Sequence, residues 1–280
     1  MIDGSRLERS LWGIARPRPA LYDTKFKPVA LNPFPPVSAG RAAAESDAVK
    51  RESVILSWSG GKDSSLTLAG LRGDPRYEVV ALLTSVTRGY DRVSIHGVRR
   101  ELLHAQAAAA GLPLLEIELE PQSSNPAYEA AFFGALDRLR TRFPTATTIA
   151  FGDLFLEDVR AYRERLLSGS GFTPLFPIWG RDTRALAEEF IDAGFVAHLV
   201  CVDTQQLSAN FAGRQFDRSL LVDLPANTDP CGERGEFHTF VSAGPIFEHA
   251  IPVAHGEVVL REDRFAFCDL LPAIAAEAPR

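Results

Sequence analysis

Residues 54–65 restrict what this chain can fold into more than any other stretch of the sequence. The stretch begins with an apolar, β-branched run at 54–56, which is typical of a buried strand. A serine and two glycines follow, and residues 66–71 then have helical character. A strand, a glycine-rich turn and a helix start point several backbone N–H groups and the positive end of the helix dipole at one spot. The stretch therefore predicts a phosphate-binding loop.

The side chains of this loop fit the same ligand. Gly60 and Gly61 let the backbone approach an anion without a Cβ in the way, and Lys62 adds a positive point charge. Asp63 is out of place beside a polyanion unless it holds Mg²⁺ or caps the helix. A glycine-rich turn without a ligand is the alternative, but the strand before it and the helix after it favour the phosphate site. The loop residues that we expect to bind the ligand are Ser57, Ser59, Gly60, Gly61, Lys62, Asp63 and Ser64.

A Walker A loop does not fit this stretch. Its pattern requires a glycine five residues before Gly61, where Leu56 stands, and a serine or threonine after Lys62, where Asp63 stands. Residues 59–64 instead resemble, at all six positions, the PP-loop SGGKDS of the N-type ATP pyrophosphatases. That resemblance implies that the ligand is ATP, that the bond between its α and β phosphates is cut, and that an adenylylated intermediate forms.

Composition excludes several classes of protein. The chain has 280 residues, 46% hydrophobic and 24% charged, as in a globular protein with a substantial core. A net charge of −6 argues against a broad nucleic-acid-binding surface, although a local basic groove stays open. No apolar run is long enough to span a bilayer, so we expect no membrane association. Cys201, Cys231 and Cys268 lie too far apart for a zinc or redox pair and favour a reduced, cytoplasmic protein.

From residue 54 onward, segments with strand character alternate with segments of helical character. The predicted strands are 54–58, 78–86, 113–119 and 147–151, and the predicted helices are 63–72, 98–110 and 128–142. This alternation indicates an α/β fold with a doubly wound parallel sheet. A further helix at 183–193 and a continuous apolar strand at 196–203 follow. Residues 1–50, which are rich in proline, predict a poorly ordered N-terminal extension.

The end of the fourth predicted strand should lie beside the loop, because ligands on such sheets bind at the carboxyl ends of the strands. Gly152 and Asp153 stand there, so we expect both to line the crevice. Asp153 could contact a ribose, Mg²⁺ or a substrate amine, and a helix cap explains it equally well. In the helix that follows, Arg160 and Arg163 are interpreted as solvated or salt-bridged positions. His96, just before the second predicted helix, faces the nucleotide in one interpretation and is a cap or surface residue in the other.

A second informative stretch, residues 229–241, concentrates polar groups around two glycines. Glu233 and Glu236 lie three apart, with Cys231 and His238 nearby, and the stretch ends in a segment of strand character. The two carboxylates could hold a cation or ammonia, or accept a proton from an attacking amine. A glycine-rich hairpin whose charges face water explains the same spacing.

Three motifs together resemble the diphthine–ammonia ligase family. They are the PP-loop, Gly-Asp followed by a Leu-Glu-Asp-Val-Arg helix within 152–160, and Cys-Gly-Glu-Arg-Gly-Glu-Phe-His-Thr at 231–239. The resemblance covers about residues 52–262. It implies a PP-loop (HUP-like) α/β domain at 51–180, a smaller C-terminal α+β domain at 181–265 and a tail at 266–280. The archaeal and eukaryotic motif is usually closer to Glu-Gly-Gly-Glu-Tyr-Glu, so residues 232–238 look more like the bacterial branch.

The resemblance also implies a reaction. Family members adenylylate the carboxylate of diphthine on a translation elongation factor, and ammonia then displaces AMP to give the amide. Carried over to this chain, Lys62 holds the departing phosphates of ATP, and Asp63 places Mg²⁺. Glu233 and Glu236 position the amine, with Asp153 as a further member of the site. Because diphthamide is absent from bacteria, the acceptor stays open: it is a carboxylate on a small molecule or on a protein. A homodimer also stays open as the oligomeric state.

Other PP-loop functions fit the sequence less well. A tRNA-thiolating enzyme needs a sulfur-carrying cysteine pattern and a basic RNA face, and the sequence shows neither. A glutamine-dependent synthetase carries its own glutaminase, but position 2 is Ile2 rather than a cysteine nucleophile. Free ammonia, or ammonia from a partner, is therefore the expected nitrogen source. A nucleotide sensor that binds ATP without turnover stays an alternative. The presence of Lys62 and Asp63, which the reaction uses, argues against it.

Overall fold

The first six strands form one sheet, in which five strands are parallel in the order β4-β2-β1-β5-β6. The computed structural model describes residues 51–89, 92–93 and 97–273, so the predictions for residues 1–50 and for His96 lie outside the described residues. The strands are β1 (Glu52–Ser57), β2 (Tyr77–Thr87), β4 (Leu114–Leu119), β5 (Thr148–Ala150) and β6 (Thr173–Leu175), with the short β3 (Arg92–Val93) antiparallel to the end of β2. The helices are α1 (Lys62–Gly73), α2 (Arg100–Ala109), α3 (Asn125–Arg142) and α4 (Glu157–Leu167). The predicted doubly wound α/β fold is confirmed.

Helices cover both faces of this sheet, as the packing of alternate residues on β1 shows. Val54 and Leu56 pack in one cluster with residues of α1 and α2, whereas Ile55 packs in another with residues of α3 and α4. All three side chains are fully buried. A strand that is buried on both faces has a continuous apolar run instead of an alternating pattern, which explains the sequence at 54–56.

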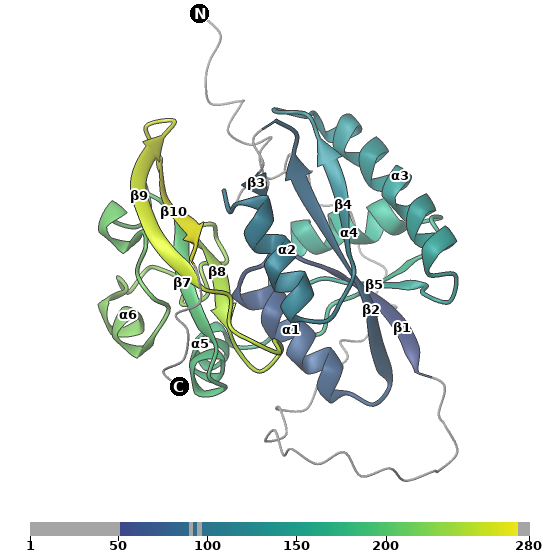
Figure 1. Ribbon diagram of the computed structural model, residues 1–280, viewed down its shortest axis with the longest axis horizontal. Helices are drawn as coiled ribbons and strands as arrows, with labels where there is room; N and C mark the ends of the chain where they lie inside the picture. The colour runs from purple at the N-terminus through teal and green to yellow at the C-terminus, as the bar shows by residue number, and fades with distance from the viewer. Residues whose placement is uncertain (1–50, 90–91, 94–96, 274–280) are drawn as a thin grey trace, which may run out of the picture.

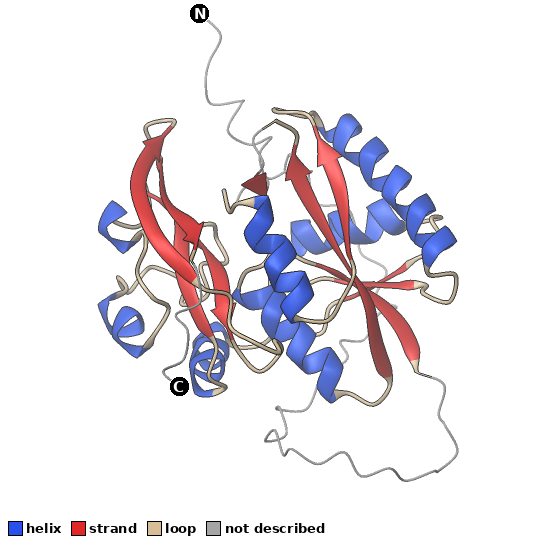
Figure 2. Cartoon of the chain, in the orientation of Figure 1, coloured by secondary structure: helices blue, strands red, loops and turns tan. Residues whose placement is uncertain are grey.

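The C-terminal part of the chain builds a smaller antiparallel sheet in the order β8-β7-β10-β9 (Figure 2). Its elements are α5 (Thr183–Asp192), β7 (Val196–Asp203), the 3₁₀ helix η2 (Ala209–Phe211), α6 (Arg218–Asp223), β8 (Phe237–Ala243), β9 (Val253–Arg261) and β10 (Phe265–Pro272). The predicted smaller α+β unit is therefore present. Figure 1 shows α1 and α2 between the two sheets.

The prediction of a tail at 266–280 is wrong for residues 266–272, because these form most of β10. This strand pairs with β7 on one side and β9 on the other. Ala266, Cys268 and Leu270 are at most 5% exposed, and this period of two is what a half-buried strand produces. This alternation of apolar residues is a better guide to the structure of the segment than its position near the chain end, which suggested a tail.

Gln106 on α2 joins the two sheets at the glycine-rich loop. Its side-chain amide donates hydrogen bonds to the carbonyl oxygens of Gly60 (2.9 Å) and of Val241 on β8 (2.7 Å). The Trp58 indole N–H donates to Oε1 of Gln106 at 3.1 Å. The backbone N–H of Val241 donates to the Gly60 carbonyl as well, at 2.9 Å. The loop is therefore fixed by both sheets.

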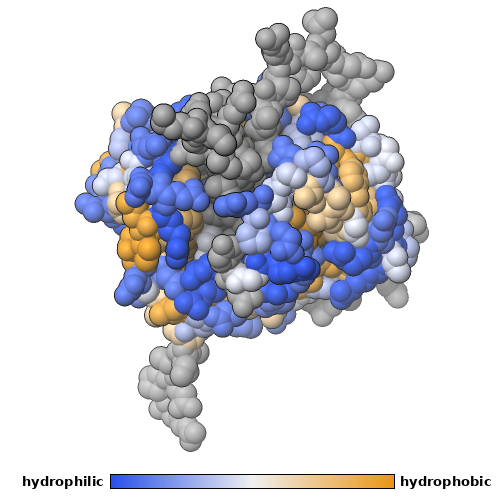
Figure 3. Space-filling model, turned by 90° about the horizontal axis from the view of Figure 1, so that it is seen from above, coloured by the Kyte–Doolittle hydropathy of each residue, from blue (hydrophilic) through white to orange (hydrophobic). Residues whose placement is uncertain are grey.

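The surface of the described residues is mainly hydrophilic in the view from above, with separate apolar patches (Figure 3). Val258 and Leu260 on the edge strand β9 are 53% and 54% exposed. Among the described helices, none combines the length and the apolar character needed to cross a membrane.

We expect Gln106→Leu to lower the free energy of unfolding by about 2–4 kcal/mol. The substitution leaves the Val241 carbonyl and the Trp58 N–H without their partners inside the protein, and each such group costs about 1–3 kcal/mol. Denaturant unfolding followed by tryptophan fluorescence measures the change. Gln205→Leu, at an exposed position, is the control and should change stability by less than about 0.5 kcal/mol. An equal effect of the two substitutions would contradict the joining role of Gln106.

Candidate active site

A cavity of about 370 Å³ lies where the first sheet meets the loop that precedes β8. The loop after β1, the tip after β5 and residues of β2, β4, α3 and α4 line it, and the second unit contributes residues 231–233 and 237–239. β1 and β5 are neighbours whose helices cover opposite faces of the sheet. Such a switch point is where α/β sheets bind their ligands.

The sharp turn of the loop requires its glycines. Gly60 has φ +78°, and a Cβ there would lie 2.6 Å from Oε1 of Gln106. At Gly61, which precedes the first turn of α1, a Cβ would lie 3.0 Å from the carbonyl oxygen of Thr239. The backbone N–H of Lys62 donates to the Thr239 hydroxyl at 3.0 Å. The start of α1 is thus packed directly against β8.

Most of the residues predicted from the sequence meet in this cavity. The following line it: Ser57, Ser59, Gly61, Lys62, Asp63, Ser64, Gly152, Asp153 and Glu233. Gly60, which was also predicted to bind the ligand, does not line it. Glu236 does not line it. The tip of β5 approaches closely, since a Cβ at Gly152 would lie 3.0 Å from the carbonyl carbon of Asp63.

Lys62 is a buried cation that is already paired. Its side chain is 2% exposed, and Nζ donates to both carboxylate oxygens of Asp63 at 2.7 Å. Burial acts to lower the pKa of Lys62, but the charge of Asp63, the charges of Cys231 and Glu233 and the hydrogen bond to Asp63 together outweigh it, so the pKa is raised. Burial raises the pKa of Asp63, and Lys62 opposes that rise. A polyphosphate that enters the site competes with Asp63 for this ammonium group.

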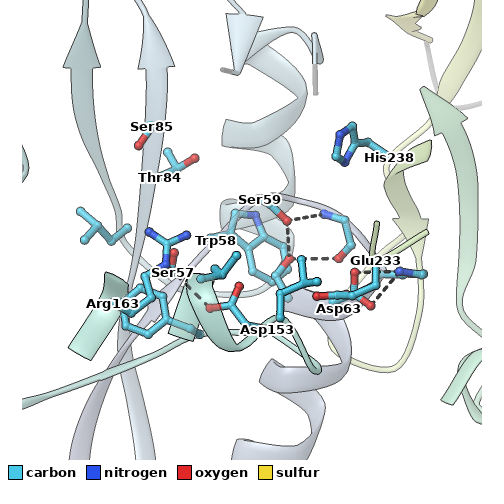
Figure 4. Close-up of a pocket in the computed structure, with 18 of the residues that line it drawn as sticks. Ser57, Trp58, Ser59, Asp63, Thr84, Ser85, Asp153, Arg163, Glu233 and His238 are labelled. Carbon is cyan, nitrogen blue, oxygen red and sulfur yellow. Dashed lines mark hydrogen bonds and ion pairs between the residues drawn. The ribbon is translucent and has the colours of Figure 1, made fainter. Parts of the chain in front are cut away.

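Glu233 brings a second carboxylate to the same place (Figure 4). Its Oε1 accepts a hydrogen bond from the backbone N–H of Leu154 at 3.3 Å. Burial, followed by the negative charge of Asp63, raises the pKa of Glu233 to about 8. The two carboxylates therefore favour a cation or a protonated amine beside them.

Glu236 holds the loop together and does not reach the cavity. Its side chain is 2% exposed; Oε1 accepts from the backbone N–H of Asp229 at 2.8 Å, and Oε2 accepts from that of Arg234 at 2.9 Å. Both oxygens are thus used within the loop. The expected place of Glu236 in the cavity is not found, because backbone N–H groups of the loop bind both of its carboxylate oxygens.

Asp229 supports the same loop from within. Its Oδ1 accepts from the backbone N–H of Cys231 at 2.8 Å and of Glu233 at 3.3 Å, and its Oδ2 accepts from the Thr183 hydroxyl at 2.9 Å. Gly232 has φ +67°, which a glycine adopts without strain. These contacts fix the backbone from which Glu233 enters the cavity.

The carboxylates fit a Mg²⁺ ion that is bound together with phosphate. No group of three or more His, Cys, Asp or Glu side chains suited to a metal occurs among the described residues. Mg²⁺ is usually held by one or two carboxylates together with substrate phosphates, so no such cage is needed. Asp63 and Glu233 supply this donor set, and burial, the largest cause of their raised pKa values, disfavours their charged forms unless a cation lies beside them.

Sequence reasoning interpreted Arg163 as solvated or salt-bridged and did not predict that it lines the cavity from α4. One turn earlier, Arg160 pairs with Glu164 at 2.8 Å and packs over Trp179, as expected for a salt-bridged position. Arg163 is salt-bridged as well, to Asp153 at 3.7 Å, and it lies over the ring of Phe151. The signal in the sequence was the Gly-Asp tip itself, since a carboxylate buried at a strand end calls for a cation nearby.

Comparisons with known proteins agree with this architecture. Residues 52–174 match the family model of the diphthamide synthase N-terminal domain, and residues 182–270 match that of the diphthamide synthase C-terminal domain. A diphthine–ammonia ligase of Schizosaccharomyces pombe is 26% identical over 218 residues, which cover 72% of this chain and 36% of that protein. The chain thus spans about a third of the length of this curated relative.

We expect Glu233→Gln to stabilise the protein at high pH. The folded protein holds Glu233 with a pKa of about 8 against an ordinary value of 4.5, so between these values it binds a proton that the unfolded chain has lost. Stability therefore falls as the pH rises through this window, and the amide variant escapes that loss. Thermal unfolding without Mg²⁺ should show a higher midpoint for the variant above pH 8 and a small difference below pH 4.5. A difference that does not depend on pH would contradict the raised pKa.

We expect Glu236→Gln to lower stability by about 1–3 kcal/mol, because an amide nitrogen cannot accept one of the two backbone hydrogen bonds. Glu257→Gln, at an exposed position on β9, is the matched control. Thermal unfolding of both variants at neutral pH measures the effect. A Glu236→Gln protein as stable as the control would show that the loop does not depend on this carboxylate.

Proposed function

The chain belongs to the diphthamide synthase family, and from this we propose that it is an ATP-dependent ligase that adenylylates a carboxylate and amidates it with ammonia. One observation carries the proposal. The phosphate-binding loop of the first sheet and Glu233 of the second unit face one cavity, so activation and amide formation can occur without transfer between sites.

In the first step, a carboxylate oxygen of the acceptor attacks the α-phosphorus of ATP. The bond from that phosphorus to the oxygen that bridges to the β-phosphorus breaks, and pyrophosphate leaves with the electron pair. The backbone N–H groups in the first turn of α1, other than that of Lys62, which Thr239 binds, and the ammonium of Lys62 stabilise the charge that develops on pyrophosphate, because they are in place beforehand. Mg²⁺ held by Asp63 and Glu233 adds charge neutralisation when bound.

In the second step, ammonia attacks the activated carbonyl carbon and AMP leaves. The nitrogen must then lose a proton. Glu233 is suited to accept it, because its carboxylate faces the cavity. Asp153 is a second acidic group in the same cavity. Glu236 has no part in this step, since both of its oxygens are bound within the loop.

The acceptor is a carboxylate on a small molecule or a protein, and the nitrogen comes from free ammonia or from a partner that supplies it. Cys201, Cys231 and Cys268 are free and buried, which supports the proposed cytoplasmic location.

A screen of metabolites and protein extracts with ATP, Mg²⁺ and ammonium tests the function. We expect an acceptor that triggers formation of AMP and pyrophosphate, and Lys62→Ala should lower that rate by about 10²-fold or more. Arg76→Ala, which removes an exposed cation at the opposite end of β2, is the control and should act as the wild type does. Formation of ADP and orthophosphate without AMP would contradict the proposed chemistry. Tight ATP binding with no turnover under any condition would favour a sensor.

A further inference from the structure

One wall of the cavity carries polar groups that the phosphate-binding loop does not use. Thr84 on β2, Asp153 after β5 and Arg163 on α4 all line the cavity. In each, one buried polar atom has no hydrogen-bond partner among the described residues: Oγ1 of Thr84, Oδ2 of Asp153 and Nε of Arg163. Figure 4 shows Thr84 and Arg163 on one side of Ser59, and Asp63 and Glu233 on the other. Buried polar groups without partners call for a ligand or a water.

The Arg163 guanidinium is held in place but has free donors. It lies over the Phe151 ring at 4.9 Å, and Nη1 donates to the Tyr128 hydroxyl at 3.5 Å. The ion pair with Asp153 spans 3.7 Å from Nε to Oδ2, which is too long for a hydrogen bond. A guanidinium has five N–H donors, so most of them stay available. A planar fork of this kind suits the two oxygens of a carboxylate.

The geometry of the proposed reaction places the acceptor on this wall. In displacement at phosphorus, the attacking and the leaving oxygen lie roughly in line. Pyrophosphate leaves toward the start of α1 and Lys62, where the donors for phosphate gather. The attacking carboxylate must therefore enter from the opposite side of the α-phosphorus. Figure 4 shows Arg163 on the side of Ser59 that is away from Asp63, the residue next to Lys62.

We propose that Arg163 binds the acceptor through a carboxylate, which it positions for attack on the α-phosphorus, while Asp153 and Phe151 fix the plane of the guanidinium. The proposal rests on the proposed ligase function and gives the acceptor side of the cavity a chemical class, a carboxylic acid in its ionised form. Arg163 is a binding residue for the acceptor and not for the phosphates.

Two titrations on the same variants test this assignment. The first measures affinity for α,β-methylene-ATP, in which the bond to be cut is blocked. The second measures affinity for acetate, succinate and glutarate on protein saturated with that analogue, by isothermal titration or by ligand-observed NMR. The variants are Arg163→Gln and Arg163→Lys, with Arg160→Gln as the matched control one turn earlier on α4.

We expect at least one of the carboxylates to bind the wild type and the Arg160→Gln control equally. Arg163→Gln should weaken that binding about 10-fold or more, which corresponds to the loss of a charge-assisted, bidentate contact. Arg163→Lys, which keeps the charge but not the fork, should fall between the two. Affinity for the ATP analogue should change less than about 2-fold in all of them. Should Arg163→Gln fail to fold, as thermal unfolding would show, Arg163→Lys decides.

Three results would overturn the assignment. They are the absence of saturable binding of every carboxylate to the wild type, an unchanged carboxylate affinity in the Arg163 variants, and a loss of nucleotide affinity as large as the loss of carboxylate affinity. The last would show that Arg163 holds a phosphate. These readouts need no turnover, so they remain decisive if the acceptor screen finds no AMP formation and the ligase function itself fails.

Discussion

The carbonyl oxygen of Gly60 accepts two hydrogen bonds, one from the Gln106 side chain and one from the Val241 backbone, and the site depends on this contact. A trans peptide is planar and its C=O and N–H point in opposite directions. A carbonyl held toward β8 and α2 therefore turns the N–H of Gly61 the other way, where it donates to the Ser59 hydroxyl at 3.3 Å at the edge of the cavity. A flip of this peptide would place an oxygen where phosphate binds in the proposed function.

Because of this contact, neither sheet forms the complete site without the other. The N–H of Lys62 is bound by the hydroxyl of Thr239, which is 177 positions away in the sequence, and the carboxylate of Glu233 is bound by the N–H of Leu154, 79 positions away. Contacts at such separation form only when the chain has closed long loops. The glycine-rich loop is local in sequence, but its geometry comes from the tertiary fold.

The parts of the site that could be predicted from the sequence are those with local causes. The strand, glycine turn and helix of residues 54–71 determine the loop, and the position of Asp153 after a strand places it at the same edge. The sequence could not separate Glu233 from Glu236, because only the fold shows that the Asp229 and Arg234 N–H groups take up the second carboxylate. Arg163 and Arg160 are likewise equal in type, and only the packing against Phe151 or Trp179 distinguishes them.

Lys62 is the only lysine between residues 51 and 280. Its ion pair with Asp63 protects it from acylation by the proposed reaction intermediate. An acyl-adenylate is an electrophile that acylates any unprotonated amine within reach. In the proposed reaction the intermediate forms in the cavity that Lys62 lines, yet an ammonium ion has no lone pair with which to attack. Because Asp63 raises the pKa of Lys62, the amine stays protonated and chemically inert, and the protein avoids becoming a substrate of its own intermediate.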